Sequence, residues 1–111
     1  MTTPTDAPLL KALKALAHPT RFRMVQEIAA AGELSCGQLG ERFHLAQPTI
    51  SHHLKLLSDS GVLTLRKAAQ HHFITVNREM IQGVLGSLPE RLSPPVARAA
   101  RKAAAKPATR R

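Results

Sequence analysis

The sequence predicts a mainly α-helical domain with one β-hairpin, followed by a last helix. In the first 60 residues, apolar side chains recur at helical spacing in four separate stretches. After Gly61 the pattern changes to β-prone residues in two short runs. The length of 111 residues fits one domain, and 43% hydrophobic residues suffice for a core. Aromatic residues are only 3%, so we expect a thin aliphatic core that a second subunit completes.

The first two helices are predicted from apolar spacing and from the residues at their ends. Residues 1–7 are short and polar, and we expect them to be flexible. The first helix then carries a stripe of leucines: Leu9, Leu10, Leu13 and Leu16. Pro19 suits the first turn of the second helix, His18 before it is a local cap or packing residue, and Gly32 is a natural stop.

The third and fourth helices lie close together in the sequence. Ser35 and Gln38 form a capping-box pattern at the start of the third helix. Only the residues 44–46 separate it from the fourth helix, which ends at Gly61. The apolar side of the fourth helix is formed by Ile50, Leu54 and Leu57, and the opposite side by Pro48, Ser51, His52 and Lys55. His52 and His53 are neighbours that point about 100° apart on a helix, so they do not form a chelating pair.

A hairpin and a last helix follow. The segments 62–67 and 71–76 are β-prone and are joined by a short Ala-Ala-Gln turn, which predicts two paired strands. Asn77 is a plausible cap for a helix over 78–88, where Gly83 and Gly86 weaken the helical pattern. We therefore expect one folded domain over residues 8–92. Residues 93–111 are low-complexity Ala, Pro, Lys and Arg, and we expect them to be disordered.

The charge distribution indicates a polyanionic partner. The chain has 16 Lys and Arg residues against 7 acids, a net charge of +9. Six of these bases and none of the acids lie in residues 93–111. Nucleic acid is the simplest polyanion for such a chain. A solvated charge excess without a partner is the alternative.

The order of elements favours DNA binding. Two helices joined by a short turn, the second polar on one side, match a helix-turn-helix, and the hairpin after them matches a wing. The major groove, about 12 Å wide, admits one helix, whose N-terminal residues meet base edges. Gln47 can pair with adenine, and Thr49, Ser51 and His52 can also reach bases. Lys55 is better placed for a phosphate.

Three segments also resemble a known family, the ArsR/SmtB winged helix-turn-helix repressors. These are LKALAHPTRFRMVQEI, ELSCGQLGERFHLAQPTISHHLKLLSDSGVL and the hairpin, and the resemblance covers roughly residues 9–88. It implies a homodimer that binds an inverted-repeat operator. The implied DNA contacts are Gln47, Pro48, Thr49, Ser51 and His52 to the operator and Arg66, Lys67 and Gln70 of the wing to phosphates. The implied dimer interface joins the first and last helices: Leu9, Leu10, Leu13, Leu16, Met80, Ile81, Val84, Leu85 and Leu88.

The chain departs from the family at its metal sites. Many members carry Glu-Leu-Cys-Val-Cys in the third helix, where this chain has Glu33-Leu-Ser-Cys-Gly37. The second family site, at the last helix, lacks its ligands, since Asn77 and Glu79 take its first positions. We therefore expect neither a bound metal nor any other cofactor. The usual capping Ser before Gln47 is Ala46, and the usual Gly of the wing is Ala69, which leaves the turn type of the hairpin open.

The sequence leaves several alternatives open. Cys36, at a helix N-terminus, is a possible thiol sensor, although a small, partly buried side chain is the favoured interpretation. A metal-sensing repressor with new ligands such as His71, His72 and Glu79 is a second possibility. An architectural, nucleoid-type DNA-binding protein is a third, because of the basic tail. No catalytic constellation indicates an enzyme, no apolar run is long enough to span a membrane, and a single cysteine fits the cytoplasm.

Overall fold

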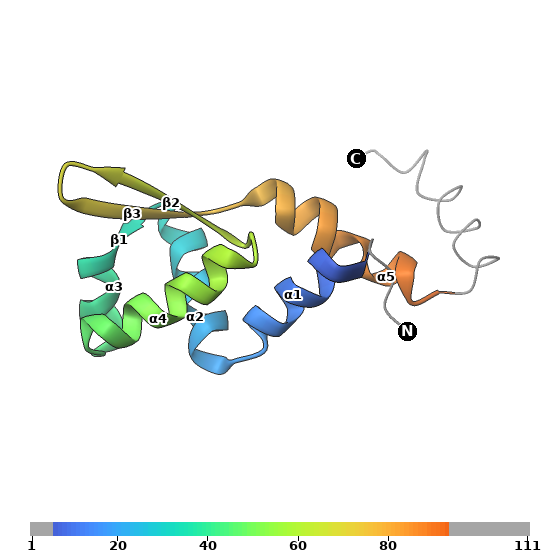
Figure 1. Cartoon of the computed structure of the whole chain (residues 1–111), viewed down its shortest axis with the longest axis horizontal. Coiled ribbons are helices and arrows are strands. Elements are labelled where there is room, and N and C mark those ends of the chain that lie inside the picture. Colours follow the sequence, from blue (N-terminus) through green and yellow to red (C-terminus); the bar gives the residue numbers. More distant parts are fainter. Residues whose placement is uncertain (1–5, 94–111) are drawn as a thin grey trace.

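The structure, a computed structural model, describes residues 6–93 and confirms the predicted fold class. Residues 1–5 and 94–111 lie outside the described residues, and with them most of the predicted flexible N-terminus (1–7) and nearly all of the predicted basic tail (93–111). Figure 1 shows the helices and the long hairpin. The elements are α1 (Ala7–Leu16), α2 (Pro19–Ala31), β1 (Leu34–Ser35), α3 (Cys36–Phe43), α4 (Gln47–Asp59), β2 (Leu63–Ala68), β3 (His71–Val76), the π-helical η2 (Met80–Val84), the 3-10 helix η3 (Leu85–Ser87) and α5 (Leu88–Arg91).

The core lies between α1, α2, α3, α4 and the sheet. Its largest fully buried side chains are aliphatic or methionine, as the low aromatic content predicts: Met24, Ile28, Leu39, Ile50, Leu54, Leu57, Val62 and Ile74. Three of these side chains come from α4, at the spacing that the sequence predicts. Burying each such side chain contributes about 1.5–3 kcal/mol. The inner face of α4 is therefore fixed by packing, and this fixes the direction in which its outer face points.

The sheet has three strands, one more than the sequence predicts. Its order is β1-β3-β2, with antiparallel pairing throughout. The two residues of β1 pair with β3, as Leu34 opposite Ile74 and Ser35 opposite Phe73. A two-residue strand is too short to show a period of two in the sequence. This strand joins the start of α3 to the base of the wing.

The turn of the hairpin has only two residues, because Ala68 pairs with His71. Ala69 adopts a φ of 57°, in the left-handed region that glycine favours. Gln70 is not among the residues with positive φ. The wing therefore keeps a tight turn even though alanine replaces the usual glycine, at a cost of about 1 kcal/mol.

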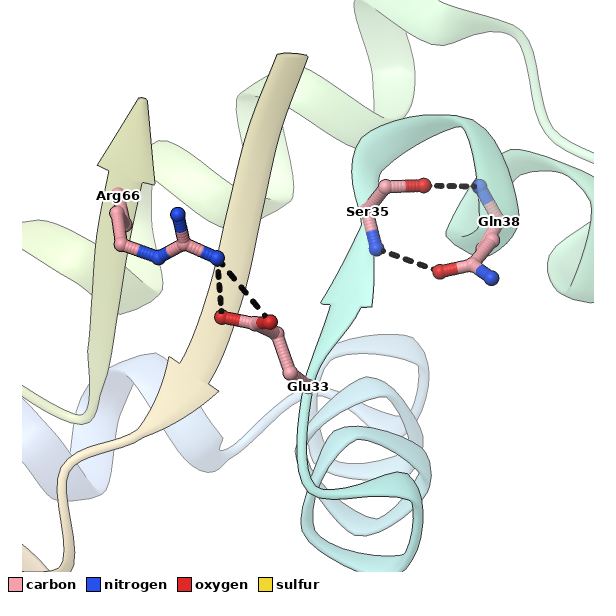
Figure 2. Close-up of polar contacts among 4 residues, drawn as sticks. All are labelled: Glu33, Ser35, Gln38 and Arg66. Atoms are coloured by element: carbon pink, nitrogen blue, oxygen red, sulfur yellow. Dashed lines mark hydrogen bonds and ion pairs between the residues drawn. The ribbon is translucent and has the colours of Figure 1, made fainter. Parts of the chain in front are cut away.

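The helix ends confirm most of the predicted caps. The Nδ1 atom of His18 accepts a hydrogen bond from the Thr20 amide at 3.1 Å. Ser35 and Gln38 form both hydrogen bonds of the capping box, at 3.1 and 2.9 Å (Figure 2). The Asn77 side chain accepts from the Met80 amide at 3.2 Å. Ala46 provides no side-chain cap to α4, as its methyl group predicts.

The segment predicted as one helix over 78–88 is helical but irregular. It passes from the π-helical η2 to the 3-10 helix η3 and then to α5. Gly83 and Gly86 lie in this segment, where glycine weakens regular helix. The segment packs against α1 through η3, and the Arg91 guanidinium forms an ion pair with Asp6 just before α1. The two ends of the described chain are therefore joined.

The leucines of α1 divide between two sides of that helix. Leu9 is 3% exposed and lies in the interior of the protomer, whereas Leu10 is 46% exposed. Of the other residues in the predicted dimer interface, Leu16, Met80, Ile81 and Leu85 pack against the core. The remaining ones, Leu13, Val84 and Leu88, are half-buried. We call these three residues, together with Leu10 and the 77% exposed Leu92, the α1–α5 surface.

Candidate nucleic-acid interface

A tight turn sets the angle between α3 and α4. Only His44, Leu45 and Ala46 separate the two helices. His44 ends α3 in the left-handed conformation, with φ 54° and ψ 41°, and its side chain is exposed. Leu45 is half-buried and packs against the core. This residue and the buried side of α4 hold the helix-turn-helix together.

The outer face of α4 is polar and exposed, as the sequence predicts. All six α4 residues expected to contact DNA are exposed: Gln47, Pro48, Thr49, Ser51, His52 and Lys55. Pro48 lies in the first turn, where its missing N–H leaves no helical hydrogen bond unmade. Lys55 forms an ion pair with Asp59 one turn later, at 3.3 Å, with both side chains largely exposed. Such an exposed pair is worth little and leaves Lys55 available to a phosphate.

Gln47 has a contact that its position in the sequence does not predict. Its side chain extends toward α3, where Nε2 lies 3.4 Å from the backbone oxygen of Cys36. Gly40, on the next turn of α3, leaves the space that this amide occupies. The side chain is therefore exposed and also held against the preceding helix.

The three predicted wing residues lie in different surroundings. Arg66 donates to both carboxylate oxygens of Glu33, at 3.1 and 3.2 Å (Figure 2). Its guanidinium also lies 4.8 Å from the ring centre of Phe73, its cross-strand partner. A phosphate would have to compete with Glu33 for this side chain. Lys67 and Gln70 are exposed, and Lys67 makes no ion pair within residues 6–93.

The wing tip and α4 border a shared hollow. This open cavity of about 490 Å³ lies between the start of α3, the first half of α4 and the turn of the hairpin. Its lining includes Gln47, Ser51, Gln70, His71 and His72. The structure thus brings Gln47 and Ser51, two of the predicted base-reading residues, close to Gln70, one of the three predicted wing contacts. His71 and His72 both line this hollow, although neighbouring residues in a strand point to opposite faces.

Cys36 does not have the surroundings of a reactive thiol. It lies at the first position of α3 and is half-buried. Burial raises the pKa of its thiol above the ordinary value. A reactive cysteine needs a lowered pKa, since the thiolate is the nucleophile. The structure favours the interpretation of Cys36 as a small packing residue.

The described residues contain no cluster that resembles a metal site. Within residues 6–93, no group of three or more His, Cys, Asp or Glu side chains is arranged to hold a metal ion. In particular, His71, His72 and Glu79 do not come together as a ligand set. In the same part of the chain, no helix is long and apolar enough to cross a membrane.

His53 occupies the inner side of α4. It is 9% exposed, and its Nδ1 atom has no hydrogen-bond partner. Its ring centre lies 5.1 Å from that of His18, the N-cap of α2. Burial, followed by the charges of His18, Arg21 and His52, lowers the pKa of His53 below the ordinary value. Both effects favour the neutral form of this ring.

We expect acid to destabilise the fold through His53. An unfolded chain binds a proton at His53 near pH 6.5, whereas the folded chain binds it only at lower pH. Stability is thus complete above about pH 6.5 and falls as the pH drops toward the lowered pKa, by no more than about 1.4 kcal/mol per pH unit. Urea unfolding between about pH 5 and 8 measures this loss. His53→Leu should flatten the profile, whereas a flat wild-type profile or an equal effect of the exposed His52→Gln would contradict it.

Comparisons with known proteins agree with this geometry. A family model described as a helix-turn-helix domain matches residues 16–66. The arsenical resistance operon repressor of Staphylococcus aureus is 33% identical over 76 residues, which cover 68% of this chain and 72% of that protein. The arsenic resistance transcriptional regulator ArsR1 of Pseudomonas putida is 37% identical over 94 residues, which cover 78% and 73% of the two chains.

Solved structures show the same fold. HlyU from Vibrio cholerae is 28% identical, has a TM-score of 0.66 and covers 82% of this chain and 98% of its own. An ArsR-like transcriptional regulator from Rhodococcus has a TM-score of 0.73 over 93% of this chain and 92% of its own, at 23% identity. The fold, the polar outer face of α4 and these relatives agree: the chain belongs to the ArsR/SmtB family of winged helix-turn-helix transcriptional repressors.

Proposed function

We propose that the protein is a homodimeric repressor that binds an inverted-repeat operator in the cytoplasm, without catalysing a reaction. The main support for this proposal is the outer face of α4, which is exposed and polar. Packing of the buried inner face fixes the direction in which this outer face points. A major groove accepts one such helix, with the residues of its first turns at the base edges. Binding to the operator need not depend on a metal ion, since the family's cysteine pair is absent from α3.

The α4 residues divide into two roles. Gln47, Thr49, Ser51 and His52 lie in the first two turns and carry groups that can hydrogen-bond to bases, while Pro48 offers an apolar contact to a thymine methyl group. Lys55 on α4, with Lys67 and Gln70 on the wing, faces phosphates and positions the protein on DNA. Arg66 can contact a phosphate only after its ion pair with Glu33 breaks.

The α1–α5 surface is the proposed dimer interface. It includes the exposed Leu10 and Leu92 and three half-buried side chains, Leu13 of α1, Val84 of η2 and Leu88 of α5. A two-fold dimer would bring two copies of α4 to successive major grooves, which requires half-sites about 34–36 Å apart. An inverted repeat is the DNA sequence that matches such symmetry.

A paired substitution tests the division between base readout and phosphate contact. Gln47→Ala should weaken binding to the preferred sequence by roughly 1–3 kcal/mol and leave binding to random DNA nearly unchanged. Lys67→Ala should weaken both by the same factor and lower the salt slope by about one unit. The preferred sequence is first selected from a random DNA library, and affinities are then measured against salt concentration.

Three results would count against the proposal. Equal losses on both DNAs for Gln47→Ala would assign Gln47 to phosphate contact. A specificity ratio well below about 10³ for the wild type would favour the architectural class of DNA-binding protein. An operator affinity that changes tenfold with zinc or arsenite, and persists in Cys36→Ser, would indicate metal sensing through histidines.

A further inference from the structure

We infer that Gly40 and the backbone oxygen of Cys36 are specificity determinants, because they hold the Gln47 amide in the orientation that reads adenine. This inference rests on the proposed function, in which Gln47 contacts a base. It adds two groups of α3 that would not touch DNA themselves. They would act by fixing one side chain before DNA is bound.

The space for Gln47 exists only because residue 40 is a glycine. A Cβ atom placed on Gly40 would lie 2.5 Å from Nε2 of Gln47 and 3.7 Å from its Cδ. Any side chain at position 40 therefore displaces the amide. Gly37, one turn earlier on the same helix, differs: a Cβ there meets only the Ser35 Oγ, at 3.9 Å.

The hydrogen bond of Gln47 sets which edge of the amide remains free. Nε2 lies 3.4 Å from the Cys36 oxygen and donates to it. Oε1 makes no hydrogen bond within residues 6–93, and Oε1 is not among the three atoms nearest to the Gly40 position. With one N–H directed to Cys36, the amide keeps one N–H donor and one oxygen acceptor for a ligand.

This donor and acceptor pair matches one base in the major groove. Adenine presents the N7 acceptor beside the N6 amino donor, and a glutamine amide satisfies both. Guanine presents two acceptors, N7 and O6, and would require two donors. An amide that rotates freely would lose more conformational entropy on binding, whereas the held amide has already lost this entropy in the free protein. The held orientation therefore favours adenine over guanine.

Gly40→Ala changes this arrangement with little effect on the fold. Alanine favours helix more than glycine does, and α3 is helical at this position. The colliding atom is the end of a flexible side chain, which can move away. The substitution therefore releases the Gln47 amide and leaves the core in place. Thermal unfolding of the variant checks that the fold is kept.

The experiment is a double-mutant cycle with a matched control. Gly40→Ala, Gly37→Ala and Gln47→Ala are made singly, and both glycine substitutions are combined with Gln47→Ala. Affinities are measured for the selected operator and for operators with each adenine replaced by guanine. We expect Gly40→Ala to reduce the preference for adenine by about 2- to 12-fold at the position that Gln47→Ala affects. Gly37→Ala should keep that preference, and neither glycine substitution should alter it in the Gln47→Ala background.

The outcomes separate this inference from the proposed function. If Gln47→Ala has no base-specific effect, the proposed role of Gln47 fails and the inference fails with it. If Gln47→Ala does act on one base pair but Gly40→Ala retains the full preference, only the inference is overturned. A preference for guanine at that position would also overturn it. An effect of Gly40→Ala that persists without Gln47 would show that Gly40 acts by another route, against the inference.

Discussion

A single charge on the α1–α5 surface, Leu10→Glu, should convert the protein to a monomer and weaken operator binding by about 100-fold or more. Leu10 is 46% exposed on α1, the helix that packs against η3. In a two-fold interface one substitution appears twice, once from each subunit. The glutamate therefore acts on both halves of the interface.

Two physical effects add at this position. Each lost leucine removes about 1.5–3 kcal/mol of apolar burial. Each buried carboxylate without a partner adds a desolvation cost or forces its own protonation. Loss of the dimer then removes the second half-site contact, and linked binding typically exceeds single binding by about 10²–10⁴-fold. The fold of the protomer should persist, since Leu10 is not part of its buried core.

Sedimentation and operator titration measure the two results separately. Leu56→Glu is the matched control for assembly, because Leu56 is 37% exposed but lies on α4, outside the α1–α5 surface. It should remain a dimer. A dimeric Leu10→Glu variant would show that the interface lies elsewhere on the molecule. A monomer with unchanged operator affinity would show that the dimer is not needed for DNA binding.

Much of the fold is encoded in local sequence. The spacing of Ile50, Leu54 and Leu57 predicts which side of α4 is buried, and the structure confirms it. The caps at His18, Ser35 and Asn77 are predictable because their hydrogen bonds reach only two or three residues along the chain. Patterns of this kind depend on neighbours in the sequence, so a single sequence contains them.

The features that the sequence did not predict depend on distant residues. β1 exists only because β3, almost 40 residues later, supplies its partner. The pairing of Arg66 with Glu33 spans 33 residues and crosses the sheet, so neither charge indicates the other in the sequence. The position of the Gln47 amide over Gly40 depends on the angle between α3 and α4, which the left-handed His44 sets. Sequence spacing carries no information about such angles.

The segment after α5 should control how strongly DNA binding depends on salt. Residues 94–111 contain six basic residues and no acid: Arg98, Arg101, Lys102, Lys106, Arg110 and Arg111. Each phosphate that they neutralise adds about 0.9 to the slope of log affinity against log salt. Full engagement of six charges would therefore change that slope by about 5 units, a larger change than any single substitution on α4 can produce.

A chain ending at Ser93 tests this contribution and keeps all the described elements. Ser93 is the right end point because its hydroxyl donates to the Pro89 oxygen of α5. The truncated protein should keep the fold and the α1–α5 surface, bind more weakly at physiological salt and show a shallower salt slope. Its preferred sequence should not change, because phosphate contacts carry no direct base information.

The measurement is a salt titration of both chains on the operator and on scrambled DNA. A full-length variant in which all six basic residues are replaced by glutamine is the control for chain length. Equal slopes for all three proteins would show that the segment takes no part in binding. A loss restricted to the operator would show instead that it reads sequence, since counterion release acts on every DNA alike.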